Sequence, residues 1–248
     1  MQSTTNLIAD NNNISGMIGM EIARLGDMAD LNHIDVSNVT TMKELFHRRS
    51  FVGDISRWDV FNVVDFSGMF DSSSFNGDIS KWNISSAKNI SKMFRSSLFN
   101  GDISTWNVSN VKSMYGTFVK SQFNGDISQW DVSNVENMSF MFSGSRFTKN
   151  ISQWDTKRVK EMTCMFHDSI FNGDISKWNV SGAYDIEAIF RSSEFYQDIS
   201  DWNFHPDAFI DNDLKRVLEN SHIIKSKKEL NLLRHTFTNK NPINSASL

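Results

Sequence analysis

The residues of this chain that could perform chemistry are few and isolated. Cys164 is the only cysteine among 248 residues. Glycine-rich phosphate loops and the motifs G-x-S-x-G and H-E-x-x-H are absent from the sequence. We therefore expect Cys164 to be a packed thiol, and the protein to be no enzyme, with no cofactor and no metal.

Aspartate recurs at a fixed interval, which raises the question of a calcium site or of DNA mimicry. Calcium needs about six to eight oxygens that converge on one point, whereas these carboxylates are spread singly along the chain. DNA mimicry needs a far stronger negative balance than the net charge of −4. We expect turn or cap roles for Asp54, Asp78, Asp102, Asp126, Asp174 and Asp198. A second Asp/Asn column, from Asp59 to Asn203, is expected to bond neighbouring loop amides.

Composition restricts the class of protein. With 39% hydrophobic and 22% charged residues the chain is typical of a folded protein, and its small net charge does not favour nucleic acid or anionic membranes as partners. A single cysteine excludes an internal disulfide. The unusual feature is aromatic: 7 Trp and 20 Phe stand against 3 Tyr.

The tryptophans define an internal repeat. They follow one another every 24 residues without an insertion, as Trp58, Trp82, Trp106, Trp130, Trp154, Trp178 and Trp202. Two Phe columns, Phe51 to Phe195 and Phe46 to Phe190, keep the same register and hold 14 of the 20 phenylalanines. Because so short a unit cannot bury its apolar face alone, the repeats must stack with equivalent side chains in ladders. We expect these ladders to be core and not a platform for sugars or bases.

The spacing within the unit changes from strand-like to helix-like. Trp106 and Val108 alternate as on one face of a strand. The residues that follow have the spacing of one face of a helical or 3₁₀ turn: Val111, Met114, Thr117 and Phe118. The Ser-Asn pair between these segments suits the start of a helical turn. Asn-Gly pairs elsewhere in the unit are typical of turns that tolerate positive φ. Each coil is therefore predicted as a strand, a cap, a helical turn and a loop.

The unit F-N-G-D-I-S-x-W-[ND]-V-S-N-V-x-x-M-x-x-M-F resembles the repeat of BspA-like leucine-rich-repeat proteins of the bacterial surface, which is roughly 25 residues long. The resemblance covers about residues 31–205 and is most specific from Trp106 to Met114. It implies a leucine-rich-repeat fold, display or secretion, and a role in adhesion or in binding host proteins.

The expected fold is an α/β repeat, a right-handed leucine-rich-repeat-like solenoid of about eight coils, each with a short parallel strand and a short helical turn, closed by helical caps. Residues 1–30 predict an N-terminal helical cap, because apolar residues recur at helical spacing: Ile14, Met17, Ile18, Ile22, Leu25 and Met28. Residues 31–205 predict the solenoid. Residues 206–248 predict a C-terminal cap and tail, with helices near 207–219 and 226–237.

Two polar surfaces are candidates for binding a partner. If Trp and Val point inward, alternate residues line an outward sheet face. We name this column the variable strip: Arg57, Lys81, Thr105, Gln129, Gln153 and Lys177. The coil around Trp154 departs most from the unit and carries a basic patch, formed by Lys149, Lys157, Arg158 and Lys160. Repeat drift on a solvated face is the alternative explanation for this patch.

These features favour a non-enzymatic repeat scaffold that binds a protein through a polar sheet face or a loop edge. Two settings remain open. The resemblance implies an adhesin-like module at a bacterial surface. Residues 1–13 lack the charged start and apolar run of a secretory signal, which favours an intracellular or virus-encoded binding protein that inhibits or recruits its partner, as immunity and anti-defence factors do.

Overall fold

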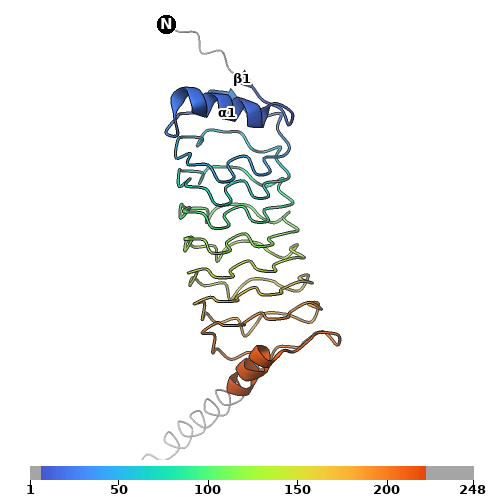
Figure 1. Cartoon of the computed structure of the whole chain (residues 1–248). Helices are drawn as coiled ribbons and strands as arrows, with labels where there is room; N and C mark the ends of the chain where they lie inside the picture. Colours follow the sequence, from blue (N-terminus) through green and yellow to red (C-terminus); the bar gives the residue numbers. More distant parts are fainter. Residues whose placement is uncertain (1–6, 222–248) are drawn as a thin grey trace, which may run out of the picture.

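The chain forms a column of stacked coils with a helix at each end, as shown by a computed structural model that describes residues 7–221 (Figure 1). Helix α1 (Ile14–Leu25) lies across the N-terminal end of the column. Strand β1 (Leu7–Ile8) pairs in parallel with β2 (Ile34–Asp35), so the residues before α1 also add a rung to the column. A helical segment at 212–221 lies at the opposite end.

Helix α1 covers the first coil through its apolar side. Ile14 and Ile18 are buried in the same core as the coils, and Met17 and Ile22 pack against its edge. The helix ends where Gly26 adopts φ 86°, a left-handed conformation that favours glycine. Met28, which the sequence places in the helical pattern, therefore lies beyond the helix and is 84% exposed.

The C-terminal helix begins later than the sequence suggests. Its start is set by Asp211, whose Oδ1 accepts a hydrogen bond from the Leu214 N–H at 2.8 Å, as an N-cap does. The helical run therefore starts at 212 and not near 207. Leu214 and Val217 are buried against the last coil. The helix predicted at 226–237 lies outside the described residues.

Adjacent coils are joined along one face by parallel backbone pairing. In the first pair, the N–H groups of Met42 and Phe46 donate to the carbonyl oxygens of Asp65 and Met69 at 2.9 and 2.8 Å. The pairing repeats every 24 residues through bridges between Thr41, Asp65, Asn89, Ser113, Asn137, Glu161 and Asp185. We name the segments that carry it the ladder segments, and the surface they form the ladder face: 41–49, 65–73, 89–97, 113–121, 137–145, 161–169 and 185–193.

The ladder segments overlap the stretches in which the sequence predicts helical or 3₁₀ turns, and they form successive turns with no regular helix. Alternate N–H groups donate to the next coil, while those between them close four-residue turns, such as the turn in which the Leu45 N–H donates to the Met42 carbonyl at 3.2 Å. An α-helix would use all of these donors internally and leave the coils unjoined. Two positions per segment have positive φ, for example Lys92 at 56° and Ser96 at 50°. This left-handed backbone interrupts regular strands and explains why long strands do not form.

The predicted strand at Trp106 and Val108 is also replaced by turns. The Trp106 N–H donates to the Ile103 carbonyl at 3.2 Å, which closes a turn inside the coil. The expectation that the aromatics form the core is confirmed, since all seven tryptophans are at most 6% exposed and the Phe46–Phe190 column is fully buried. Rings of that column stack from coil to coil at 5.6–5.9 Å between centroids.

The glycine of the Asn-Gly pair serves close packing and not a left-handed turn. The positive-φ glycines of the described chain are Gly26, Gly68, Gly116 and Gly144, none of which follows an asparagine. At Gly77, an added Cβ would lie 2.8 Å from Cε2 of Phe75. The prediction that the glycine of the Asn-Gly pair serves a positive φ is therefore wrong. Glycine is needed at Gly77 because a side chain there would collide with the buried Phe75 ring.

Candidate functional site

The variable strip does not lie on a sheet face. Its six residues are all exposed, but each occupies the turn that precedes a tryptophan, away from the ladder face. Some of these side chains contact polar neighbours. Arg57 Nη2 lies 3.5 Å from Asp30 Oδ2, and Gln153 Nε2 donates a hydrogen bond to Ser152 Oγ at 3.2 Å. The strip is thus a row of exposed polar side chains on successive turns.

The basic patch is divided by the structure. Lys157, Arg158 and Lys160 line a hollow of about 250 Å³ with Glu136 and Gly182, and Lys149 is not part of it. Lys160 Nζ lies 2.7 Å from Glu136 Oε2, and Arg158 bonds to the Asn134 side chain. Lys160 is therefore already paired with a carboxylate, and Arg158 is already hydrogen-bonded to a neighbouring side chain.

The aspartate columns hold turns, as the sequence predicts. In the coil of Asp102, its Oδ1 accepts the Ser104 N–H at 2.9 Å, and Asn107 Oδ1 accepts the Ser109 N–H at 3.1 Å. The bonds from Ser104, through both its backbone and its side chain, hold the pKa of Asp102 below its ordinary value. Among residues 7–221 no group of His, Cys, Asp and Glu is placed to hold a metal ion.

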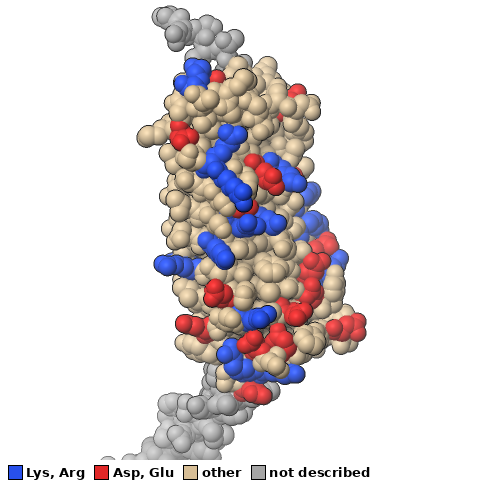
Figure 2. Space-filling view, in the orientation of Figure 1, with Lys and Arg blue, Asp and Glu red and all other residues tan. Residues whose placement is uncertain are grey.

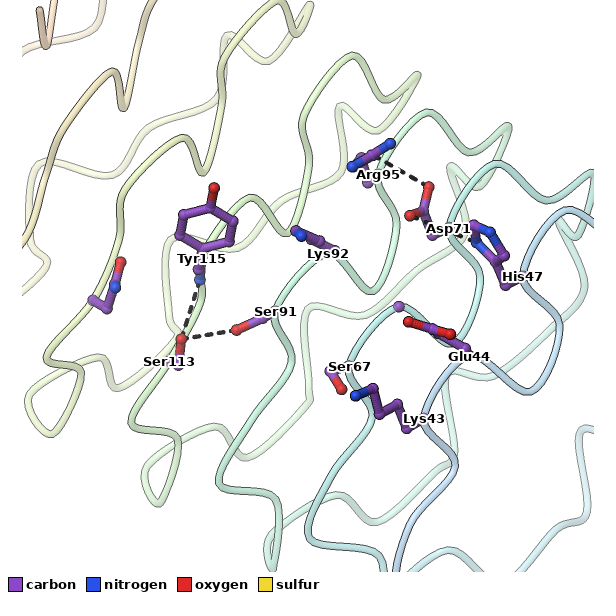
Figure 3. A pocket seen from close by; sticks show the side chains of 12 residues that line it. Lys43, Glu44, His47, Ser67, Asp71, Ser91, Lys92, Arg95, Ser113 and Tyr115 are labelled. Atoms are coloured by element: carbon purple, nitrogen blue, oxygen red, sulfur yellow. Dashed lines mark hydrogen bonds and ion pairs between the residues drawn. The ribbon is translucent and has the colours of Figure 1, made fainter.

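The ladder face carries a groove that the sequence analysis did not find. It measures about 560 Å³ and is lined by side chains from five consecutive ladder segments, beginning at Lys43 and ending at Asn137. The lining includes the small residues Ser67, Gly68 and Ser91. Figure 3 shows the Ser67 and Ser91 side chains among the residues that line the groove. A second hollow of about 230 Å³ continues it toward Phe140. We name the two together the ladder-face groove.

One wall of the groove is formed by three side chains at equivalent positions of successive coils: His47, Asp71 and Arg95. Asp71 Oδ2 lies 3.6 Å from His47 Nδ1, and its Oδ1 lies 3.4 Å from Arg95 Nε. The Asp71 side chain is only 8% exposed and also accepts a 2.8 Å hydrogen bond from Ser72 Oγ. Figure 3 shows this carboxylate between its two partners. The Asp71 carboxylate therefore finds its partners within the protein, and the Arg95 side chain stays partly exposed.

Aromatic rings and a cation lie at the other end of the groove. Lys92 Nζ lies 5.3 Å from the centre of the Tyr115 ring, which is within the range of a cation–π contact. The Tyr115 and Phe140 ring centroids are 5.6 Å apart, and both side chains are partly exposed. These are aromatics outside the buried ladders, so they are available to a ligand.

Basic residues are more frequent in the N-terminal half of the ladder face, and acidic residues are more frequent in its C-terminal half. The four segments from 41 to 121 hold six Lys or Arg and three Asp or Glu, whereas the three segments from 137 to 193 hold one Arg and four Asp or Glu. On the side of the molecule shown in Figure 2, basic side chains gather over the N-terminal coils and acidic ones become frequent lower down. The groove lies in the basic half.

Sequence reasoning missed this site because it assigned the ladder segments to helical turns. Turns assigned within separate coils do not place Lys43 and His47 on the same surface as Lys92, whereas the observed pairing of the ladder segments brings all three to one groove. The available signal was glycine at Gly68, Gly116 and Gly144, in the columns that adopt positive φ. A helical segment does not favour glycine at regular intervals.

Cys164 does not line the ladder-face groove. It is half-buried, and burial raises the pKa of its thiol.

The described residues contain no helix of the length and apolarity needed to cross a membrane.

Comparison with known proteins identifies related sequences at the level of a family. Residues 13–124 and 112–226 each match the model of a family described as "Mycoplasma protein of unknown function, DUF285". The two matches overlap and together extend over most of the chain, as expected of a repeat protein. No curated protein and no solved structure matches the sequence.

Proposed function

The chain belongs to the DUF285 family, and we propose that it is a non-enzymatic repeat scaffold that binds a protein partner through its ladder face. The observation that carries this proposal is the ladder-face groove, which draws its lining from five consecutive coils. A surface assembled from many equivalent positions suits an extended partner better than a small substrate.

The scaffold beneath the groove is suited to binding without rearrangement. Met42, Phe46 and their equivalents are buried directly under the ladder face, and inter-coil hydrogen bonds hold the backbone on both sides of each segment. A surface that is already ordered loses little conformational entropy when it binds. Its specificity would come from side chains that differ between coils while the backbone stays the same.

The wider classification is part of the proposal. We propose that the column is a right-handed leucine-rich-repeat-like solenoid related to BspA-like surface proteins. Parallel pairing at a 24-residue interval supports a solenoid. The W-N-V-S-N-V core supports the relationship.

Two settings for the binding function are proposed as alternatives, an adhesin-like module on a cell surface and an intracellular inhibitor or recruiter. Protease treatment of intact cells separates them. Digestion of the native protein supports surface display, and protection until lysis supports the intracellular role.

The binding face is tested by charge reversal. The double variant Lys43→Glu, Lys92→Glu should lose a partner captured by the wild-type chain from a native lysate. The matched control is Lys81→Glu, Lys177→Glu, which makes the same charge change on the exposed variable strip. Loss of the partner in the strip variant alone would contradict the ladder-face assignment and favour the strip.

A further inference from the structure

The geometry of the ladder-face groove points to an extended acidic peptide as its ligand, and we propose that the partner presents such a segment, with carboxylates about 10 Å apart and an apolar side chain beyond them. This inference rests on the proposed function and specifies the chemistry that the groove recognises.

The first step is the supply of uncompensated positive charge. Within residues 7–221, Lys43, Lys92 and Lys120 form no ion pair. Lysines on the neighbouring face differ, since Lys112 and Lys160 both pair with Glu136. Lys43, Lys92 and Lys120 line the ladder-face groove together. An anionic ligand would therefore gain favourable charge contacts with these three lysines without breaking an existing ion pair.

The second step concerns the kind of anion. Glu44 lies in the same groove and is exposed, and Asp71 forms part of its wall. A polyanion with a charge on every unit, such as nucleic acid or a sulfated polysaccharide, would meet Glu44 as well as the lysines. A ligand with separated carboxylates can place each one beside a lysine and keep neutral groups against Glu44. The groove thus favours an acidic peptide over a uniform polyanion.

The third step is the match of repeat lengths. Lys43 and Lys92 belong to ladder segments two coils apart, and parallel rungs are about 4.8 Å apart, so their backbones are separated by about 10 Å along the column. A peptide in the extended polyproline II conformation advances about 3.1 Å per residue and has three residues per turn, so side chains at every third position lie on one side, about 9 Å apart. Acidic side chains at this spacing in a peptide that runs along the column would meet both lysines.

The fourth step is the polar and apolar lining. Hydroxyl groups of the lining can bond the peptide backbone. Ser91 Oγ and Ser113 Oγ share a 2.8 Å hydrogen bond, and because both residues are partly exposed, the hydroxyl that accepts this bond can donate to a ligand. The ladder N–H groups already donate between coils, so the peptide would be held by side chains and not as an added strand. Tyr115 and Phe140 lie one and two coils beyond Lys92 and offer contact to an apolar side chain.

The experiment uses the full chain and a labelled peptide, acetyl-Glu-Ala-Thr-Glu-Ala-Thr-Leu-amide, in fluorescence polarisation at low and physiological salt. Its counterpart with Gln in place of Glu is the control ligand. The acidic peptide should bind more tightly than the Gln peptide, and its affinity should fall with salt. The Lys43→Glu, Lys92→Glu variant should weaken binding about tenfold or more, while Lys81→Glu, Lys177→Glu leaves it unchanged.

A variant of the aromatic end tests the apolar contact. Tyr115→Ala should weaken binding of the peptide that ends in Leu and leave a peptide that ends in Ala unaffected. Equal binding of the Glu and Gln peptides, equal losses in both lysine variants, or binding of heparin without binding of the acidic peptide would overturn the inference. If the peptide fails while the lysate partner is still lost in the Lys43→Glu, Lys92→Glu variant, the ladder face remains the binding surface and only the peptide class is wrong.

Discussion

The indole Nε1 of Trp130 donates a 3.0 Å hydrogen bond to the carbonyl oxygen of Ile103 in the preceding coil. The other six tryptophans make the equivalent bond at 2.9–3.1 Å. On this side of the column the side chains join coils whose backbones are occupied by internal turns. Each tryptophan thus fills the core and also satisfies a buried carbonyl.

Two substitutions at Trp130 separate these roles. Trp130→Ala should lower the free energy of unfolding by about 3–5 kcal/mol, because it truncates a buried side chain. Trp130→Phe keeps much of the volume and removes the indole bond, while the Ile103 carbonyl keeps the Trp106 N–H as a donor, so this variant should lose about 0.5–1.5 kcal/mol for the hydrogen bond. Urea denaturation measures both. A loss below about 1 kcal/mol for Trp130→Ala would be incompatible with a core position.

The aspartate turns make stability depend on acid pH. Hydrogen bonds from the serine two residues on hold the pKa of Asp54, Asp78, Asp102 and Asp126 below the ordinary value of 3.8. Because these values are lowered in the folded state, the stabilisation is fully present above the unfolded-state pKa. It is lost as pH falls through about 4 and on through the lowered folded-state values.

The double variant Asp102→Asn, Asp126→Asn tests this assignment. Asn150 already fills the equivalent place in another coil, where its Oδ1 accepts the Ser152 N–H at 2.9 Å, so asparagine can keep the turn. The variant should remain folded at neutral pH and show a shallower loss of stability below pH 4. An unchanged acid dependence would mean that these turns do not contribute to it.

The left-handed positions of the ladder predict a gain in stability from glycine. Ser192 has φ 56°, is exposed, and lies in the same column as Gly144 at φ 63°. Non-glycine residues pay roughly 1 kcal/mol for this conformation. Ser192→Gly should therefore raise the free energy of unfolding by up to about 1 kcal/mol, and Gly144→Ala should lower it by a similar amount. A loss of stability in Ser192→Gly together with a gain in Gly144→Ala would contradict the backbone described for the ladder segments.

Burial should protect Cys164 from alkylation. Its raised pKa reduces the fraction of thiolate at pH 8, and the thiolate is the reactive form. Iodoacetamide should modify Cys164 in the native chain more slowly than in the chain unfolded in urea. Mass spectrometry gives the two rates, and equal rates would show that the thiol is not packed.

The sequence predicted the repeat and its core because both depend on residue identity at a fixed interval. Trp106 and Phe118 are buried where the 24-residue register requires them. The turn role of Asp102 was equally accessible, since an aspartate two residues before a serine can close its own turn.

The local backbone could not be predicted in the same way. Val111 and Met114 have the spacing of a helix face and both are buried in the core, yet the Val111 N–H closes a turn with the Val108 carbonyl and the Met114 N–H donates to Asn137 in the next coil. Periodicity reports which residues are buried, and it does not distinguish a helix from successive tight turns. The groove depends on that backbone, so Lys43, Asp71 and Tyr115 were not recognised as neighbours on one surface.

The central claim, that the ladder face binds the partner, is tested most directly by site-specific photo-crosslinking. Benzoylphenylalanine placed at Ser96 lies on the rim of the ladder-face groove, and at Gln129 it lies on the variable strip. Both positions are exposed, so the probe can be accommodated at either without disturbing the core. The account predicts a covalent adduct with the partner from position 96 and none from position 129. An adduct from position 129 alone would contradict it.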